Sequence, residues 1–301
     1  MLAAADASAS PRPTIINADK RVLPASLSAT RARGKDTGNT AAIGATRFSY
    51  GPHRDQFGEL TRPEGGEPPW PVAVLLHGGF WRARYDLRLQ DGLAADLAAR
   101  GWVAWNLEYR RLGWRSRGGW PATFEDVAAG IDQLGRLDMP LDLARVVAIG
   151  HSAGGHLALW AAARRGLPRG APGAEPSVRV AGAVAQAGVA DLREAARLGL
   201  SRGAARSLLG GPPGRMPQRY DLASPIERLP LGVPQLLVHG GADDSVPISI
   251  ARRYAERAAE AGDPCELVEL AGAGHYEHLD PASEAWRAVI DWIERLGGRP
   301  R

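Results

Sequence analysis

One short segment, residues 147–157, constrains this chain of 301 residues more than any other. Apolar, β-branched residues lead into a Gly-x-Ser-x-Gly pattern centred on Ser152, and a run of helix-forming residues follows. A strand, a tight turn and a helix around a serine hold the hydroxyl at a sharp corner, clear of the sheet. The first amides of such a helix also point toward negative charge that develops beside the serine. The segment therefore predicts that Ser152 is a nucleophile at the end of a buried strand.

From about Thr46 onward, short apolar runs alternate with longer helical patterns. Strands are expected at 72–76, 102–107, 145–149, 178–185, 235–238 and 266–270, and helices at 87–100, 124–137, 248–261 and 283–296. Continuous apolar strands between helices are typical of a sheet whose two faces are both covered. We therefore predict an α/β fold for residues 46–301, with a mostly parallel central sheet and helices on both faces.

Two segments depart from this alternation. Residues 1–45 are rich in Ala, Ser, Thr, Pro and Arg without sustained periodicity, so we expect a poorly ordered N-terminal extension. Residues 189–230 contain Gly-Gly-Pro-Pro-Gly and several arginines. A long segment of this kind either connects two elements over the surface or forms a cap above the site. Both interpretations fit the sequence.

The charge and the cysteine content limit the partners and the compartment. The formal net charge is +4, and the first 40 residues, with six basic and three acidic side chains, carry most of it. A nearly neutral body argues against nucleic acid as a partner. Cys265 is the only cysteine, which excludes an intrachain disulfide and a cysteine-ligated metal cluster. The chain has no apolar run of about 20 residues and no secretory signal, so we expect a cytoplasmic protein without a membrane span.

A serine hydroxyl needs a base within hydrogen-bond reach to act as a nucleophile at neutral pH. His275 lies in a glycine-containing loop directly after the last expected strand, where reactive groups of a parallel sheet gather. We predict His275 as this base, and His278, three residues later, is the alternative. The base in turn needs a carboxylate that fixes its tautomer. Asp243 and Asp244 follow the preceding strand and are both candidates, and Asp191 is a weaker one.

A glycine pair follows the first strong strand, within the sequence His-Gly-Gly-Phe-Trp of residues 77–81. Glycines let backbone amides approach a substrate oxygen closely. We expect an oxyanion hole formed by Gly78, Gly79 and Phe80 together with the amide of Ala153, the residue after the nucleophile. The alternative is an ordinary tight turn. A site of this kind requires no metal and no organic cofactor.

These motifs resemble the α/β-hydrolase superfamily over about residues 46–296. The His-Gly-Gly-Phe-Trp form is similar to the kynurenine formamidase (arylformamidase) and small carboxylesterase branch, and the serine motif is also similar to that of hormone-sensitive-lipase-like esterases. The acid loop resembles that of prolyl-oligopeptidase-type hydrolases, in which the first aspartate of such a pair is the triad acid, so the resemblance implies Asp243. The chain departs from those peptidases in having fewer than 80 residues before His77. It departs from the lipase-like esterases in having Phe80 in place of a third glycine.

The resemblance implies a serine hydrolase that cleaves a small-molecule carboxylic ester or amide through an acyl-enzyme, with Ser152, Asp243 and His275 as the triad. An arylformamidase acting on N-formylkynurenine or a similar N-formyl aromatic amine is the first alternative. A non-catalytic binding protein with the same fold is the second. Such proteins usually lose a member of the triad, whereas this chain keeps a candidate for each.

Aromatic residues give the only signal for substrate recognition. Trp81 and Trp120 fall in expected loops above the sheet, where they would line an apolar substrate pocket. The competing interpretation is that these large side chains brace long loops. Glu108, at the end of an expected strand, either pairs within the protein or contacts a polar substrate. We expect His151 and His156, on either side of the nucleophile, to be packed or hydrogen-bonded structural residues.

Overall fold

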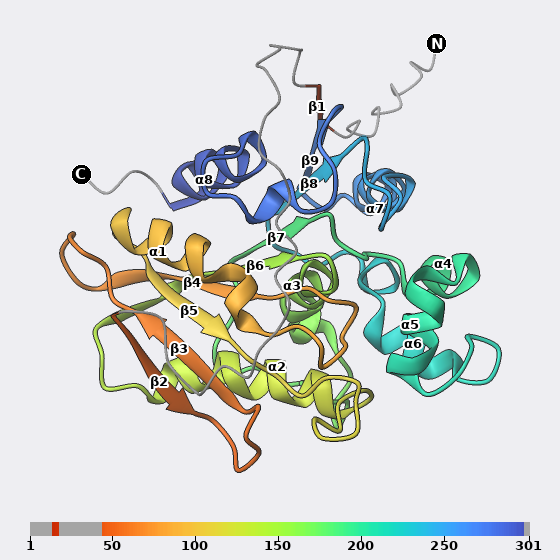
Figure 1. Ribbon diagram of the computed structural model, residues 1–301, viewed down its shortest axis with the longest axis horizontal. Coiled ribbons are helices and arrows are strands. Elements are labelled where there is room, and N and C mark those ends of the chain that lie inside the picture. The colour runs from red at the N-terminus through yellow and green to blue at the C-terminus, as the bar shows by residue number, and fades with distance from the viewer. Residues whose placement is uncertain (1–13, 18–43, 298–301) are drawn as a thin grey trace, which may run out of the picture.

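The structure is a computed structural model and describes residues 14–17 and 44–297. One sheet runs through the centre of the molecule (Figure 1). The strands in these ranges are β1 (Thr14–Asn17), β2 (Ala45–Ser49), β3 (Phe57–Thr61), β4 (Trp70–Leu76), β5 (Val103–Leu107), β6 (Leu141–His151), β7 (Gly182–Gln186), β8 (Gln235–Gly240) and β9 (Cys265–Leu270). Their order across the sheet is β1-β9-β8-β7-β6-β4-β5-β3-β2. β3 is antiparallel to both β2 and β5, and the remaining pairs are parallel.

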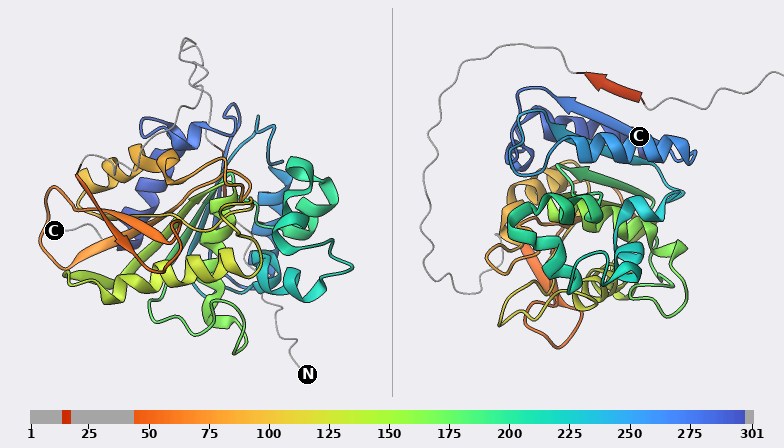
Figure 2. Two further views of the ribbon diagram at one scale, coloured as in Figure 1. Left: turned by 60° about the horizontal axis from the view of Figure 1, so that its bottom comes forward. Right: turned by 90° about the vertical axis from the view of Figure 1, so that its right-hand side faces the viewer.

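Helices cover both faces of this sheet, as Figures 1 and 2 show. The helices of one face are α1 (Asp91–Ala99) and α8 (Glu284–Gly297), and those of the other are α2 (Ala122–Asp132), α3 (Ala153–Ala163) and α7 (Ser249–Glu260). Alternate residues of a strand point to opposite faces, so β4 contributes to both cores. Val72, Val74 and Leu76 pack in the core of α2, α3 and α7. Ala73 and Leu75 pack in the core of α1 and α8.

The predicted α/β fold, with a mostly parallel sheet and helices on both faces, is confirmed. The six strands from β4 to β9 all correspond to expected strands, although β7 begins at Gly182 rather than at 178. The hairpin of β2 and β3 was not predicted. Its second strand contains Glu59, a buried carboxylate that forms ion pairs with Arg47 and Arg88 and interrupts the apolar run. Short 3-10 helices are η1 (Leu87–Gln90), η2 (Gln133–Arg136), η3 (Arg164–Gly166) and η5 (Glu277–Leu279).

The N-terminal segment contributes one strand to the sheet. β1 pairs in parallel with β9 at the edge, with Ile16 opposite Val268, which the expected extension of residues 1–45 did not include. The rest of that expectation concerns residues 1–13 and 18–43, which lie outside the described residues.

The segment 189–230 forms a helical excursion between β7 and β8, composed of α4 (Leu192–Leu198), α5 (Leu200–Leu209), α6 (Pro217–Ala223) and η4 (Pro225–Arg228). Its helices lie together beside the sheet, on the right of Figure 1. Four hydrogen bonds from the body of the protein end on backbone carbonyls of this excursion. The donors are Arg82, the Trp120 amide, His156 and Trp160, and the acceptors are the carbonyls of Ser201, Leu208, Ala223 and Leu222, respectively.

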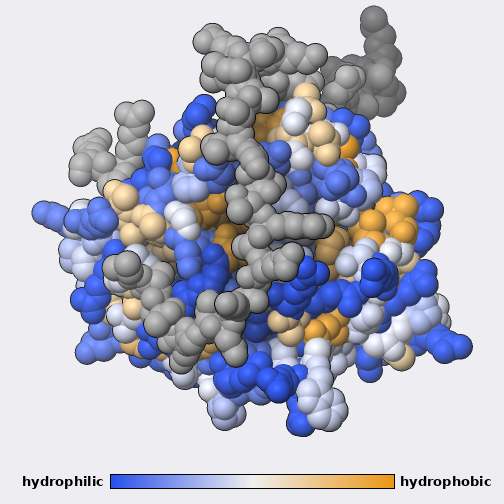
Figure 3. Space-filling view, in the orientation of Figure 1, coloured by the Kyte–Doolittle hydropathy of each residue, from blue (hydrophilic) through white to orange (hydrophobic). Residues whose placement is uncertain are grey.

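The face seen in Figure 1 is mostly hydrophilic, with separate hydrophobic patches rather than a continuous apolar band (Figure 3). Among the helices of the described residues, none has both the length and the apolar character that a membrane crossing needs.

Candidate active site

Ser152 occupies a strained corner between β6 and α3. Its φ of 56° and ψ of −117° lie outside the usual regions for a residue with a side chain, and its amide donates to the Gln186 carbonyl at 2.8 Å. The corner also requires a glycine two residues later. A Cβ at Gly154 would lie 1.8 Å from the Leu76 carbonyl oxygen, so the helix packs against β4 at a distance that no other residue permits. The local sequence therefore determines the path of the chain around Ser152.

His275 and Asp243 meet above the carboxyl ends of β8 and β9. The Nδ1 atom of His275 lies 2.8 Å from Oδ2 of Asp243, a distance at which the ring nitrogen donates to the carboxylate. With its proton on Nδ1, the imidazole keeps a lone pair on Nε2 and can accept a proton there. The other oxygen of Asp243 accepts from the amides of Ser245 and Val246, each at 2.9 Å. Asp243 is thereby fixed in one orientation toward the base.

The electrostatic surroundings keep Asp243 ionised. Burial by itself raises the pKa of Asp243, but hydrogen bonds from His239 and His275 and from the Val246 amide outweigh burial and lower the pKa well below its usual value. His239 lies behind the acid loop, with its Nε2 atom 2.9 Å from the Val246 carbonyl oxygen. A carboxylate that stays negative can stabilise an imidazolium on His275 during a reaction.

The alternative acids have other partners, and the alternative base does not line the cavity that contains Ser152. Asp244 is exposed and accepts from its neighbour Ser245. Asp191 caps α4 by accepting from the Glu194 amide at 2.9 Å. Burial, followed by the neighbouring His239 and His275, lowers the pKa of His278 to about 3. The geometry therefore brings Asp243, rather than these residues, to His275.

Ser152 and His275 line the same cavity, whose empty volume is about 310 Å³. The Ser152 hydroxyl is buried and has no hydrogen-bond partner among the described residues. Hydrogen bonds between a nucleophile and its base are often loose until substrate binds, so this arrangement is compatible with catalysis. The other lining residues are Gly79, Phe80, Tyr85, Leu89, His151 and Tyr276.

The loop after β4 lines the same cavity through Gly79 and Phe80. Gly79 has a φ of 107°, and the two following residues, Phe80 and Trp81, also have positive φ values of 50° and 57°. Glycine adopts such a φ freely, but Phe80 and Trp81 each cost roughly 1 kcal/mol or more, so the surrounding structure must hold the loop in place. Among the described residues, no acceptor faces the amides of Gly79, Phe80 or Ala153. These amides are available to an oxygen atom in the cavity.

Gly78 contributes to the loop in a different way from its neighbours. Its carbonyl oxygen lies 2.8 Å from Nδ1 of His77, and a Cβ at this position would lie 2.9 Å from Nδ1 of His151. Gly78 does not line the cavity, whereas Gly79 and Phe80 do. Of the predicted oxyanion donors, the structure therefore brings Gly79 and Phe80 to the cavity beside Ser152.

The predicted pocket residues Trp81 and Trp120 need correction. Trp81 is only 1% exposed, and its ring nitrogen lies 3.3 Å from Nδ1 of His156. Trp120 packs on Phe124 with a ring separation of 5.1 Å. Neither lines the cavity around Ser152, because both side chains turn into the packing around α2 and α3. The bracing interpretation describes these two residues correctly.

Three lining residues were not predicted from the sequence: Tyr85, Leu89 and Tyr276. Tyr276 directly follows the base, so its position in the His275 loop was an available signal. Tyr85 and Leu89 come after the oxyanion loop, and no pattern in the sequence shows that the chain turns back toward Ser152 there.

The histidines on either side of Ser152 are hydrogen-bonded within the protein, as predicted. His151 Nε2 lies 2.8 Å from the His275 carbonyl oxygen, and His156 Nε2 lies 2.9 Å from the Ala223 carbonyl oxygen. Burial is the main reason that the pKa of His151 falls to about 3 and that of His156 to about 4. Both rings are therefore neutral near pH 7, and His151 supports the loop that carries the base.

Two relatives of the chain are named as ester hydrolases. Esterase LipC of Mycobacterium tuberculosis (strain ATCC 25618 / H37Rv) is 30% identical over 231 residues, which are 71% of this chain and 55% of LipC. The probable carboxylic ester hydrolase LipM of the same organism is 29% identical over 252 residues, which are 76% of this chain and 57% of LipM. The chain spans somewhat more than half the length of these two relatives.

Solved structures share the fold. The butyrate-bound esterase Est2 of the Planctomycetes species Thermogutta terrifontis has a TM-score of 0.68 and 25% identity, covering 85% of this chain and 95% of Est2. A truncated carbohydrate esterase from gut microbiota has a TM-score of 0.70 and 19% identity, covering 84% of this chain and 97% of that protein. The fold is that of the α/β-hydrolase superfamily. Within that superfamily, residues 59–257 match the BD-FAE family, and the chain therefore belongs to the BD-FAE family.

Proposed function

We propose that the protein is a serine hydrolase that cleaves small carboxylic esters through an acyl-enzyme. One observation carries this proposal: His275, oriented by Asp243 at 2.8 Å, shares a cavity with Ser152 and with the unpaired amides of Gly79 and Phe80. Nucleophile, base, acid and oxyanion donors are the parts that acyl transfer needs. The esterase names of LipC, LipM and Est2 support the same reaction.

In the first half of the reaction, the Ser152 hydroxyl attacks the ester carbonyl carbon while His275 Nε2 takes the hydroxyl proton. The carbonyl oxygen becomes an oxyanion, which accepts hydrogen bonds from the amides of Gly79, Phe80 and Ala153. Asp243 stabilises the imidazolium that has formed. The tetrahedral intermediate then expels the alcohol, which receives the proton from His275, and the acyl group remains on Ser152.

In the second half, a water molecule takes the place of the alcohol. His275 accepts a proton from this water as its oxygen attacks the acyl carbon, and the same amides bind the second oxyanion. Collapse of this intermediate returns the proton to the Ser152 oxygen and releases the carboxylic acid. The enzyme is then ready for another substrate.

The cavity favours an apolar acyl group of modest size. Its walls include the rings of Phe80, Tyr85 and Tyr276 and the side chain of Leu89. A pocket of this composition suits short aliphatic or single-ring acyl groups. Est2 has been solved with butyrate bound, which supports short acyl esters as the first substrates to test.

A fluorophosphonate probe tests the reaction class. Est2 has been solved phosphoramylated by tabun, another organophosphorus compound. We expect stoichiometric labelling of the protein, and none of the Ser152→Ala variant. A non-catalytic binding protein would remain unlabelled in both forms. Absence of wild-type labelling, or equal labelling of Ser152→Ala, would reject Ser152 as the nucleophile.

A substrate panel then separates ester from formamide cleavage. p-Nitrophenyl butyrate should be turned over with a higher kcat/KM than N-formylkynurenine, the substrate that the His-Gly-Gly-Phe-Trp motif brings into consideration. A clear preference for N-formylkynurenine would instead assign the arylformamidase activity to the same triad.

A further inference from the structure

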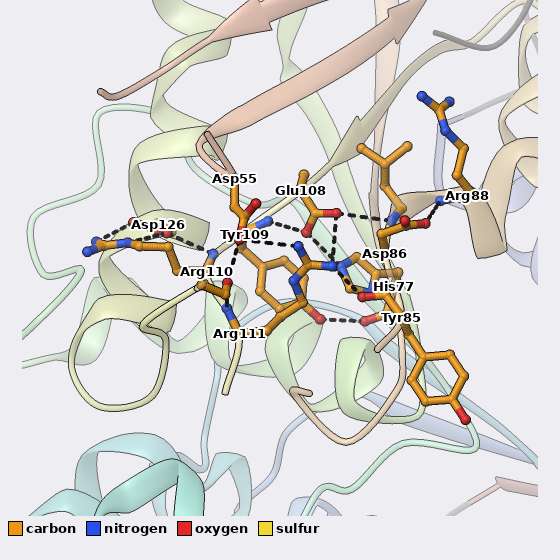
Figure 4. A network of polar contacts seen from close by, with 12 residues as sticks. Asp55, His77, Tyr85, Asp86, Arg88, Glu108, Tyr109, Arg110, Arg111 and Asp126 are labelled. Carbon is orange, nitrogen blue, oxygen red and sulfur yellow. Dashed lines mark hydrogen bonds and ion pairs between the residues drawn. The ribbon is translucent and has the colours of Figure 1, made fainter. Parts of the chain in front are cut away.

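A buried group of charged side chains surrounds His77, the residue that directly precedes the oxyanion loop (Figure 4). We call it the Glu108 cluster; it consists of Asp55, His77, Glu108 and Arg111, none of which is more than 6% exposed. Glu108 and Arg111 follow β5, His77 follows β4, and Asp55 precedes β3. Burying charged groups costs free energy unless they are paired. We therefore asked what role this cluster has in the structure or in function.

Three of the four contacts of the Glu108 carboxylate are with N–H donors, and the fourth is with a ring nitrogen of His77. Its Oε1 atom accepts from the Tyr109 amide at 2.8 Å and lies 3.0 Å from Nε2 of His77. Its Oε2 atom accepts from the Leu87 amide at 3.3 Å and lies 3.2 Å from Nη1 of Arg111. Two backbone amides and a guanidinium group all favour the negatively charged form of a carboxylate. The surroundings of Glu108 therefore fit the ionised carboxylate.

The His77 ring lies between two acceptors. Nδ1 lies 2.8 Å from the Gly78 carbonyl oxygen, and Nε2 faces the Glu108 carboxylate. A neutral imidazole has one N–H and would leave one of these contacts without a proton, whereas an imidazolium satisfies both. Tyr109 completes the enclosure by stacking on the ring at 4.4 Å and donating its hydroxyl to the His77 carbonyl at 2.6 Å.

A charged His77 would balance the charges of the Glu108 cluster. Glu108 and Asp55 supply two negative charges, and Arg111, which lies 3.3 Å from Asp55, supplies one positive charge. Arg54 also lies 3.4 Å from Asp55, but it is 63% exposed and therefore contributes little. An imidazolium on His77 supplies the second buried positive charge.

We infer that Glu108 is a positioning residue for the oxyanion hole, which it holds in place by keeping His77 doubly protonated. In a trans peptide, the C=O of one residue and the N–H of the next point in opposite directions. When His77 binds the Gly78 carbonyl, the Gly79 amide turns the other way, toward the cavity that Gly79 lines. The positive charge of His77 also lies next to the site of the developing oxyanion. This role rests on the proposed hydrolase function.

Nitrogen NMR of the protein labelled with ¹⁵N-histidine tests the charge of His77 without any substrate. The His77 signals are assigned by their loss in His77→Gln. At about pH 8 we expect one-bond N–H couplings on both ring nitrogens in the wild type and in Ser152→Ala, and on only one in Glu108→Gln. A singly protonated His77 ring in the folded wild type would overturn the inference, whether or not the protein hydrolyses esters.

Kinetics with a matched control test the consequence for catalysis. Asp126 is a second buried carboxylate, paired with Arg110 at 2.6 Å, and neither side chain lines the cavity. We expect Glu108→Gln to lower kcat about 10–100-fold with KM within about twofold, because the oxyanion exists only in the transition state and intermediates. Asp126→Asn loses a buried charge as well but should keep the wild-type kcat.

Equal kcat values for Glu108→Gln and Asp126→Asn would overturn the positioning role. If Ser152→Ala retains full hydrolysis, the proposed function fails, and the NMR result still decides the protonation of His77. If Glu108→Gln does not fold, the spectra of the wild type and of Ser152→Ala alone decide whether His77 is doubly protonated.

Discussion

The two halves of the candidate site are held by different kinds of contact. On the triad side, Ser152, Asp243 and His275 each follow their own strand directly, and hydrogen bonds within the acid loop and between Asp243 and His275 orient the acid and the base. On the oxyanion side, a loop with three successive positive φ values is held by the buried charges of the Glu108 cluster. The comparison teaches that a nucleophile and its base can be built from local chain geometry. An arrangement of free amides needs support from distant parts of the chain.

The largest effect is expected on the triad side, from Asp243→Asn. An amide at this position cannot act as the negative partner of His275 Nδ1 and favours the wrong tautomer of the ring, so kcat should fall by about 10⁴-fold. Steady-state kinetics on p-nitrophenyl butyrate measure this loss.

Asp244→Asn is the control for that change, because Asp244 is the exposed neighbour and does not contact His275. Its kcat should stay within about twofold of the wild type. An inactive Asp244→Asn with an active Asp243→Asn would exchange the two roles.

The next largest effect is expected on the oxyanion side, from Gly79→Ala, which changes no charge. A Cβ at Gly79 would lie 2.5 Å from the Tyr85 ring, and the φ of 107° disfavours any side chain. Gly79→Ala should therefore displace the amide and lower kcat by about 100-fold, the usual size for one lost oxyanion donor.

Gly66→Ala is a matched control for backbone strain. Gly66 also has a positive φ of 84°, is exposed, and lies away from the cavity. Both variants should lose stability in urea titrations, but only Gly79→Ala should lose activity. Wild-type kcat in Gly79→Ala would remove this loop from the catalytic machinery.

The last effect concerns stability rather than activity. Three buried histidines near Ser152 and His275 should make the free energy of unfolding depend on pH. Burial lowers the pKa of His151 and His278 to about 3 and that of His156 to about 4. The unfolded chain takes up protons below its ordinary histidine pKa of about 6.5, whereas the folded state does not. Stability is therefore fully present above about pH 6.5 and is lost as the pH falls toward 4. At pH 5 the loss should be roughly 1–2 kcal/mol for each of the three.

Urea unfolding at pH 7.5 and pH 5 measures this difference. His156→Gln should reduce this pH-dependent loss by one histidine's share. A free energy of unfolding that is the same at both pH values would contradict the neutral state of the three buried rings.

The sequence predicted the parts of the molecule that depend on neighbouring residues. The six strands from β4 to β9 have continuous apolar runs, and the loops that carry Ser152, Asp243 and His275 follow three of these strands directly. Contacts between distant residues account for what was missed. Trp81 pairs with His156, 75 positions away, and Glu108 contacts His77, 31 positions away. β1 has four residues, and its partner β9 lies about 250 positions later, so no local pattern predicts their pairing.

Hydrogen bonds to its main chain attach the excursion of residues 189–230 to the body of the protein, which determines where substitutions would break the attachment. The four hydrogen bonds that it receives from the body end on its backbone carbonyls, which every amino acid supplies equally. Substitutions along the excursion therefore leave these attachments intact as long as the main chain follows the same path. The donors Arg82, His156 and Trp160 have no such freedom, because their side chains make the bonds. As far as these four bonds are concerned, substitutions are tolerated on the excursion side of the junction and not at the three side-chain donors of the body, whereas the buried apolar side chains of the excursion are constrained by core packing.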